Sequence, residues 1–299
     1  MSETSHLGSG FELTPPKILL MGGAGTGKTT AIGTLVDWVS ENIPEGRVFA
    51  LFTENGLETL IKYFTDRNKP IPACLHWNVV KTSTAGLSSL KAAAELVGKS
   101  TYESLAKSVD SKRAQNNVFA RIITLLGDFH DQRTGKNFGA ADVDWTEKDF
   151  LAVDGLTELS HCAMKMQIGT KPTAALPDYM VAQVNLMNLL RLLVNGTRCG
   201  LIMTAHPVRE KDELTGAVKL MPRTIGSAIA SELAPLFSEV ILTVRDGDKW
   251  FWDTQNSSAD LKTRYLPISS KLPPDVTQIL NGWSKAAAAA KTGNLEEVQ

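Results

Sequence analysis

The sequence predicts an α/β protein with a mainly parallel central sheet, helices on both faces and an antiparallel extension near the C-terminus. Short apolar runs of strand character alternate with longer segments in which apolar residues recur at helical spacing, which is typical of strands joined by crossover helices. A glycine-rich segment at 22–29 separates the first strand-like run from the first helical one. Two strand-like runs at 238–245 and 249–253 flank Asp246-Gly247-Asp248, which predicts an antiparallel hairpin.

The first half of the chain contains four strand-like runs, each short and rich in apolar, aromatic or β-branched residues. These predicted strands are 17–21, 47–53, 75–80 and 150–154. Apolar residues at helical spacing predict helices at 30–40, at 56–66 and within 86–129. Residues 134–147 are polar and contain two glycines, so we expect a loop there.

The second half begins with residues 164–177, which lack periodicity and contain Gly169, Pro172 and Pro177, so we expect an exposed loop. Asp178 then stands where it can cap an apolar helix. Trp250 and Trp252 alternate with Phe251 on the predicted hairpin, and we expect them to pack at the core and edge rather than to stack on bases. The remaining predictions are strands at 199–204 and 262–266, a loop or hairpin at 208–223, and helices at 224–236 and around the alanine run 286–290.

The length and composition are sufficient for one large domain. With 299 residues and 43% hydrophobic content, we expect a polar N-terminal tail (1–14), a domain over 15–283 that contains a helical insertion or loop at 86–147, and an alanine-rich to acidic tail (284–299). No apolar run approaches the ~18 residues of a membrane span, and residues 1–10 lack the features of a signal peptide. We therefore expect a cytoplasmic protein with no membrane partner.

Charge and cysteine content exclude some classes of site. The formal net charge of −1 argues against a uniformly basic surface, so a nucleic-acid contact would need local clusters or summation over an oligomer. Cys74, Cys162 and Cys199 show no C-x-x-C spacing, which indicates neither a zinc site nor a disulfide framework.

The segment 22–29 matches the phosphate-binding pattern G-x-x-x-x-G-K-[ST] in full, between a strand and a helix. Glycines let successive backbone N–H groups turn toward one anion, and the helix adds its positive end. Lys28 is placed to reach the β- and γ-phosphates of a nucleotide such as ATP, and the Thr29 hydroxyl suits Mg²⁺. The alternative is an ordinary glycine-rich turn. The candidate nucleotide-binding residues are Gly22, Gly23, Ala24, Gly25, Thr26, Gly27, Lys28, Thr29 and Thr30.

Two acids follow predicted buried strands. Asp154 ends the strand 150–154, as expected for a second Mg²⁺ ligand near the phosphate loop, although many core strands end in a turn aspartate. Glu54 ends the strand that follows the first helix, where it could orient a water molecule for attack on the γ-phosphate. Equally, Glu54 could favour the dipole of the helix that follows.

The order of four segments resembles the ATPase core of the RecA superfamily. These are the phosphate loop, Phe52 to Leu57, Val153 to Thr157, and Met203 to His206. The resemblance covers about 17–266, although 86–147 has no counterpart, and the chain is most similar to short RecA-like ATPases of bacteriophages. It implies a Mg²⁺-dependent ATP hydrolase with Glu54 as catalytic base and His206 as γ-phosphate sensor. A structural histidine beside Pro207 is the alternative for His206.

A second part of the resemblance is Lys262-Thr263-Arg264. In the hexameric helicase and KaiC branches, a K-x-R on a late strand reaches the neighbouring subunit's ATP site, which implies that Lys262 and Arg264 act across an oligomer interface. Alternation on a strand would put both cations on one face. A solvated basic strand end is the alternative.

In RecA-like recombinases, DNA is bound by the two loops that follow the Asp154-type and sensor strands. The matching cations are Lys165, Lys171, Arg209, Lys211, Lys219 and Arg223, and a solvated loop is the competing interpretation.

The resemblance therefore implies an ATPase that acts on single-stranded DNA in phage recombination or annealing, in the host cytoplasm. Its expected partners are single-stranded DNA, copies of itself in a ring or filament, and a single-strand-binding protein. The alternatives are a KaiC-like regulatory or assembly ATPase and a helicase or packaging motor.

Overall fold

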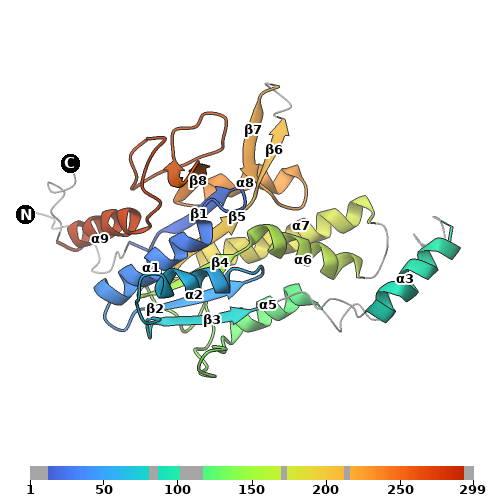
Figure 1. Cartoon of the computed structure of the whole chain (residues 1–299), viewed down its shortest axis with the longest axis horizontal. Coiled ribbons are helices and arrows are strands. Elements are labelled where there is room, and N and C mark those ends of the chain that lie inside the picture. The colour runs from blue at the N-terminus through green and yellow to red at the C-terminus, as the bar shows by residue number, and fades with distance from the viewer. Residues whose placement is uncertain (1–12, 81–86, 102–116, 170–173, 212–215, 293–299) are drawn as a thin grey trace, which may run out of the picture.

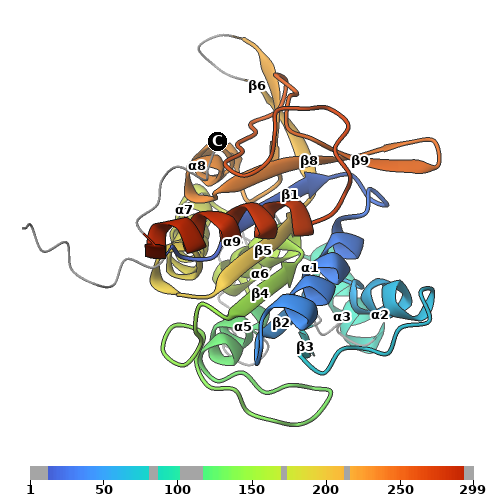
Figure 2. The same cartoon turned by 90° about the vertical axis from the view of Figure 1, so that its left-hand side faces the viewer.

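The computed structural model describes residues 13–80, 87–101, 117–169, 174–211 and 216–292. Its centre is a seven-stranded sheet in the order β3-β2-β4-β5-β1-β8-β9, crossed by helices on both faces (Figures 1 and 2). A separate two-stranded hairpin of β6 and β7 projects from the body (Figure 1). The strands are β1 (Lys17–Gly22), β2 (Arg47–Phe52), β3 (Leu75–Val79), β4 (Asp149–Asp154), β5 (Gly200–Ala205), β6 (Pro207–Lys211), β7 (Val218–Pro222), β8 (Glu239–Asp246) and β9 (Lys249–Asp253).

Strand direction confirms the predicted fold class. In the seven-stranded sheet, the neighbouring strands β3, β2, β4, β5, β1 and β8 all pair in parallel, and β9 pairs antiparallel to β8. Because β1 lies between β5 and β8, the strand before the phosphate loop is the fifth of seven across the sheet. The carboxyl ends of β1, β2, β4 and β5 therefore meet at one edge.

Helices cover the two faces of this sheet. One face packs against α1, α2 and α9, and the other against α5, α6, α7 and α8. The helices are α1 (Lys28–Asn42), α2 (Leu57–Thr65), α3 (Leu87–Lys99), α5 (Val118–Gly127), α6 (Leu156–Ile168), α7 (Leu176–Arg191), which continues into a short π-helix η1 (Leu192–Gly196), α8 (Ser227–Leu236) and α9 (Thr277–Thr292). None of the helices in the described ranges is long and apolar enough to cross a lipid bilayer.

Alternation along the buried strands explains the two cores. On β1, Ile18 and Leu20 join the cluster that includes α1 and α9, whereas Leu19 joins the cluster that includes α6 and α7. Successive side chains of a strand point to opposite faces, so a run that is apolar throughout is buried on both sides. The predicted strand 17–21 has this character, and all three of these leucine and isoleucine side chains are at most 2% exposed.

The loop 134–147 is anchored to the core by Ala141 and Trp145, whereas 134–137 and 142–144 are exposed. Phe49 of β2 stacks on Trp145 with ring centroids 3.9 Å apart and meets Phe129 and Phe138 edge to face. Asp131, itself 1% exposed, accepts hydrogen bonds from the backbone N–H of Trp77 and from the Thr134 hydroxyl. Aromatic contacts thus anchor a segment that has no regular secondary structure.

Two sequence expectations are wrong. Residues 164–168 are not a loop but the last turn of α6, so Lys165 lies on a helix. Residues 262–266 form no strand; a single bridge joins Lys262 to Val240, and the buried Glu239 carboxylate accepts the backbone N–H groups of Arg264 and Tyr265. In each case a tertiary contact decides a segment whose local pattern is weak.

Helix boundaries also differ from the expectations. The helix expected to be capped by Asp178 begins at Leu176, and Asp178 lies in its first turn, where its carboxylate accepts the Ala175 N–H. The final helix begins at Thr277, well before the alanine run, because Val276 and Ile279 are buried. The predicted domain boundary at 283 therefore falls inside α9.

Parts of the predicted organisation lie outside the described residues. These are residues 1–12 of the N-terminal tail, 102–116 of the 86–147 insertion, 293–299 of the C-terminal tail, and Lys171.

The aromatic cluster under β2 predicts a large stability effect. Phe49→Ala should lower the free energy of unfolding by about 3–5 kcal/mol, because a fully buried ring that stacks on Trp145 is lost. Chemical denaturation measures this change. Ile123→Ala, at a side chain that is 47% exposed on α5, should change stability by no more than ~0.5 kcal/mol. Similar losses in the two variants would contradict the role of the cluster.

Candidate functional site

The glycine loop between β1 and α1 takes the backbone conformation that its sequence requires. Gly25 and Gly27 have φ angles of 73° and 86°, in the left-handed region that favours glycine. Gly22 closes β1, and α1 begins at Lys28. Thr26 braces the turn, because its hydroxyl donates to the Gly23 carbonyl at 2.8 Å. The loop thus stands at the N-terminus of a 15-residue helix, whose free N–H groups favour an anion.

The Lys28 ammonium is folded back onto this loop. It donates to the carbonyl oxygens of Gly22 and Gly23, both at 2.7 Å, and the residue is only 9% exposed. Burial lowers the pKa of Lys28, while the negative charges of Asp154 and Glu54 act in the opposite direction. A buried cation with only two carbonyl acceptors is suited to bind an anion that enters the loop.

Asp154 joins the phosphate loop to the rest of the sheet. Its Oδ2 accepts the Thr29 hydroxyl at 2.9 Å, and its Oδ1 accepts the Thr204 hydroxyl of β5 at 2.6 Å. The Thr204 Oγ1 in turn accepts the Gly155 N–H at 2.9 Å. The carboxylate is 5% exposed and is therefore held in one orientation, with Thr29 beside it.

Two glycines leave room for the acids. A Cβ on Gly56 would collide with the Asp154 carboxylate, and a Cβ on Gly155 would collide with the Thr53 hydroxyl and lie 3.0 Å from Glu54 Cγ. The backbone that follows β2 therefore passes directly over the end of β4, a close approach that only glycine permits.

Glu54 and His206 face each other across this edge. The Glu54 Oε2 and His206 Nε2 atoms are 3.5 Å apart, an ion pair when the imidazole is protonated, and each side chain is about a third exposed. The backbone N–H of His206 donates to the Thr157 hydroxyl at 3.1 Å, which places His206 beside the start of α6. Both side chains are accessible for contact with a ligand.

Glu54, Asp154, Thr29 and His206 line one cavity of about 720 Å³. Its polar lining combines hydroxyls, carboxylates and imidazoles at the carboxyl edge of the sheet, where open α/β sheets bind ligands. The lining residues are Thr29, Thr53, Glu54, Asn55, Gly56, Thr59, Asp154, Thr157, Glu158, His161 and His206.

The other side of the phosphate loop is covered by β8 and β9. The Thr243 hydroxyl of β8 lies 2.7 Å from that of Thr26, and the indole N–H of Trp250 donates to the Gly25 carbonyl at 2.9 Å. Trp252 is fully buried, as expected for core packing, but Trp250 is 42% exposed and lies on the loop. The strand pairing of β1 with β8 brings about this contact.

The cations expected to bind DNA are dispersed. Lys165, on α6, lies 3.8 Å from the Glu158 carboxylate. Arg209 and Lys211 lie on β6, Lys219 on β7 and Arg223 directly after it. The structure brings these last four to one projecting hairpin and leaves Lys165 apart from it.

Lys262 and Arg264 lie at the opposite, amino-terminal edge of the sheet, where the bridge to Val240 follows the start of β8. The Lys262 ammonium donates to the Pro235 carbonyl at 3.1 Å. Neither residue belongs to the site of its own chain.

Sequence reasoning missed Thr204, Gly56 and His161 as residues of this site, and for Trp250 it favoured packing over base stacking. Thr204 had a signal, since it is a polar residue at the end of an apolar strand, beside His206. The contact of Trp250 with the glycine loop had no signal in the sequence, because it depends on the pairing of strands about 220 residues apart.

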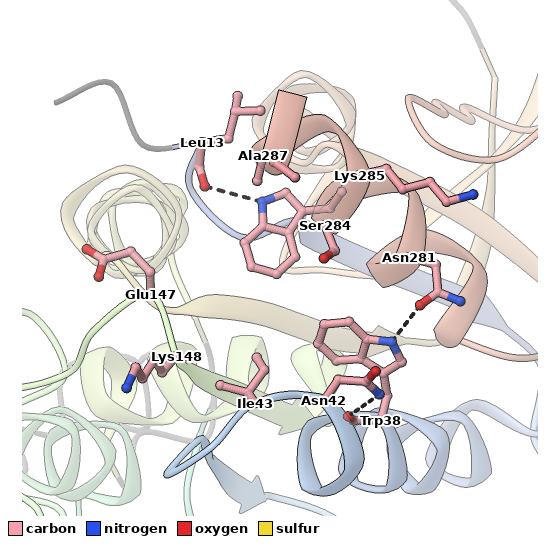
Figure 3. A pocket seen from close by; sticks show the side chains of 12 residues that line it. Leu13, Trp38, Asn42, Ile43, Glu147, Lys148, Asn281, Ser284, Lys285 and Ala287 are labelled. Atoms are coloured by element: carbon pink, nitrogen blue, oxygen red, sulfur yellow. Dashed lines mark hydrogen bonds between the residues drawn. The ribbon is translucent and has the colours of Figure 1, made fainter. Parts of the chain in front are cut away.

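A second cavity, of about 630 Å³, lies between α1, α9 and the segment before β1 (Figure 3). The Trp38 indole N–H donates to Asn281, and that of Trp283 donates to the Leu13 carbonyl. This cavity lies near the C-terminal end of α1 and the residues before β4, away from the phosphate loop. Its lining contains neither Glu54 nor Asp154, nor any residue of the segment 22–29.

A magnesium ion fits the hydroxyl and carboxylate of Thr29 and Asp154. Mg²⁺ in nucleotide sites is held by one or two protein oxygens, with phosphate oxygens and water completing the shell. Within the described ranges, no group of three or more His, Cys, Asp and Glu side chains is arranged to hold a metal ion by itself.

No family model matches the sequence, and no curated protein matches it. Among solved structures, the chain is similar to a prototypical ATPase from the type III secretion system of pathogenic bacteria, with 14% identity and a TM-score of 0.40, over 93% of this chain and 62% of that chain. The match thus spans less than two thirds of that ATPase. The function of this chain is therefore inferred from the geometry of its own site.

The bond from Thr204 to Asp154 predicts a selective effect. Thr204→Val should destabilise the protein by at least ~2 kcal/mol, because two buried groups, Asp154 Oδ1 and Gly155 N–H, each lose a partner. Thr204→Ser keeps the hydroxyl and should cost only about 1 kcal/mol for the lost methyl group. Urea denaturation measures the stability of both variants. If Thr204→Val were as stable as Thr204→Ser, the bridging role of the hydroxyl would be ruled out.

Proposed function

We propose that this protein binds ATP with Mg²⁺ and hydrolyses it. One observation carries the proposal: a full phosphate loop lies at the same sheet edge as Asp154, which is bonded to Thr29, and Glu54, which lines the cavity next to them. A phosphate anchor, a metal-binding oxygen pair and a carboxylate base are the parts that nucleoside triphosphate hydrolysis needs.

In the proposed mechanism, the backbone N–H groups of the loop and Lys28 hold the phosphates. Lys28 would exchange its two carbonyl acceptors for phosphate oxygens, and the incoming negative charge would offset the cost of its burial. Glu54, about a third exposed in the cavity, accepts a proton from water as the water oxygen bonds to the γ-phosphorus. The bond from that phosphorus to the β–γ bridging oxygen breaks, and ADP and phosphate are the products. Thr29 and Asp154 would hold a bound Mg²⁺, which would neutralise part of the negative charge of the phosphates.

His206 is the proposed sensor of the γ-phosphate. Its imidazole lies 3.5 Å from Glu54, and its carbonyl accepts the Arg223 N–H at 2.7 Å. The Thr157 hydroxyl also donates to the Arg223 carbonyl at 3.1 Å. A movement of His206 on nucleotide binding would therefore reach the base of the β6–β7 hairpin directly.

We further propose that the β6–β7 hairpin binds single-stranded DNA, as in phage recombination or annealing. The register supports this, because Arg209 and Lys211 alternate onto one face, whereas Glu210 lies opposite Lys219 on the other. Glu210, one of three acids in this segment, is therefore not on the face that carries Arg209 and Lys211. The other two, Asp212 and Glu213, lie outside the described residues. Summation over a ring or filament would supply affinity that the net charge of −1 does not.

A homo-oligomer is part of this proposal, with Lys262 and Arg264 acting in the neighbouring subunit's site. Their position at the edge of the sheet opposite their own phosphate loop is compatible with action in trans. The other candidates are a KaiC-like regulatory ATPase with a protein partner and a helicase or packaging motor. Stimulation of ATP turnover by DNA favours the first proposal over the regulator, and directional unwinding favours the motor.

Lys28 and Glu54 should separate binding from hydrolysis. Lys28→Ala should abolish the rise in melting temperature caused by Mg-ATP, because the phosphates lose their cation. Glu54→Gln should keep that rise but slow phosphate release by about 10²–10⁴-fold, because the general base is lost. Unchanged turnover in Glu54→Gln would remove Glu54 from the mechanism, and no thermal response of the wild type to Mg-ATP would refute nucleotide binding.

The basic face of the hairpin predicts salt-dependent DNA binding. With a non-hydrolysable ATP analogue at low salt, the wild type should bind a fluorescent oligonucleotide, and the double variant Arg209→Ala/Lys211→Ala should lower the slope of log K against log salt by roughly 1–2 for the two lost contacts. Lys285→Ala, an exposed cation on α9, serves as the control and should leave the slope unchanged. Absence of binding by the wild type would reject the DNA proposal and leave the ATPase proposal standing.

A further inference from the structure

The tip of the β8–β9 hairpin lies against the phosphate loop. Besides the hydrogen bond from Trp250 to the Gly25 carbonyl, Trp250 Cδ1 is 3.4 Å from the position that a Cβ would take on Gly27. The indole therefore packs on Gly27, the glycine directly before α1. Even so, the residue remains 42% exposed, so part of the ring is free to contact another molecule.

Arg245 adds a cation to the same place. Its guanidinium carbon lies over the Trp250 ring, 5.4 Å from the ring centroid. Its Nη1 is 4.0 Å from the position of a Cβ on Gly25, and its Nε donates to the Gly247 carbonyl at 2.9 Å. Arg245 and Trp250 are directly opposite each other in the β8–β9 register. Together they form a flat aromatic and cationic surface beside the loop.

The order of the strands indicates which end of a bound nucleotide would contact the surface formed by Arg245 and Trp250. Asp154 ends β4 and Glu54 follows β2, and both strands lie on one side of β1, whereas β8 and β9 lie on the other side. A triphosphate in the loop with its γ-phosphate toward the two acids extends its nucleoside away from them. That direction leads toward β8 and β9.

We propose that Trp250 and Arg245 form the nucleoside-binding part of the site, with the Trp250 ring stacking on the base. This inference rests on the proposed nucleotide binding and deepens it. The indole N–H is already used by Gly25, so the ring offers its π surface and no donor. Stacking without hydrogen bonds accepts any base and is stronger for the larger purine rings. The site therefore prefers purine over pyrimidine nucleotides and discriminates little between adenine and guanine.

The competing role of Trp250 is to hold the shape of the loop through the Gly25 carbonyl. The two roles differ in what they do to a ligand without a base. Stacking matters for ATP and not for inorganic tripolyphosphate, whereas loss of loop shape weakens both ligands. Trp250→Phe provides a second separation of the two roles. It keeps an aromatic ring that can stack on a base, but it removes the N–H donor that bonds to the Gly25 carbonyl.

The test measures dissociation constants of the full chain with Mg²⁺ for ATP, GTP, CTP and tripolyphosphate. Trp250→Ala should weaken ATP and GTP binding by about 5- to 150-fold, the range that loss of one base–aromatic stack implies. CTP should be weakened less, and tripolyphosphate should be unchanged. Trp250→Phe should retain most of the ATP affinity. Arg245→Ala should weaken ATP binding by a few-fold with no change for tripolyphosphate, since its part is to support the ring.

Trp77→Ala is the matched control. Trp77 lies on β3, at the other end of the sheet, and also has an arginine over its ring, with the Arg133 guanidinium 5.5 Å from the centroid. Its loss should leave all four affinities unchanged in protein that a melting curve shows to be folded. Equal loss of ATP and tripolyphosphate in Trp250→Ala, or no loss of ATP, would overturn the inference. A wild type that binds neither ligand would refute the proposed function itself, and the inference with it.

Discussion

The carboxylate of Asp154 is the contact on which the arrangement of the site depends. It accepts two hydroxyl groups, one from Thr29 at the start of α1 and one from Thr204 at the end of β5. The parallel pairing of β4 with β5 places Thr204 next to Asp154, whereas Thr29 reaches Asp154 from the first turn of α1. Because the carboxylate is almost fully buried, each hydrogen bond is made in a poorly solvated place, where an unpaired charge would be costly.

The surroundings of this carboxylate hold charges ready for a ligand. Lys28 is desolvated and bonded only to carbonyl oxygens, whereas Glu54 and His206 remain partly in water. Lys28 is a buried cation and Asp154 a buried anion, and Glu54 lines the polar cavity beside them. This arrangement favours a ligand that carries negative charge at one end and reacts with the help of a base. The proposed hydrolysis of a nucleoside triphosphate uses each of these groups in a separate role.

Two hairpins adjoin the site on opposite sides of β1, since β6 follows β5 and β9 pairs with β8. The β6–β7 hairpin is attached at its base to His206 and Thr157 through Arg223, so it adjoins the end of the cavity where a γ-phosphate is expected. The β8–β9 hairpin touches the phosphate loop itself through Trp250, on the side proposed for the nucleoside. The proposed nucleotide site thus lies between the basic face of the β6–β7 hairpin and the aromatic surface of Trp250.

Local patterns in the sequence were enough for the fold class, for the glycine turn of segment 22–29 before α1, and for the positions of Glu54 and Asp154 where β2 and β4 end. Glycine spacing and apolar periodicity are properties of neighbouring residues, and the backbone obeys them wherever the segment lies. The strand order, the Thr204 bridge and the contact of Trp250 with Gly25 were decided only by the tertiary structure, because they join residues between about 50 and 225 positions apart. The same reason explains the misplaced loop at Lys165 and the missing strand at Lys262: their local patterns were weak, and packing against distant elements determined the conformation of each segment.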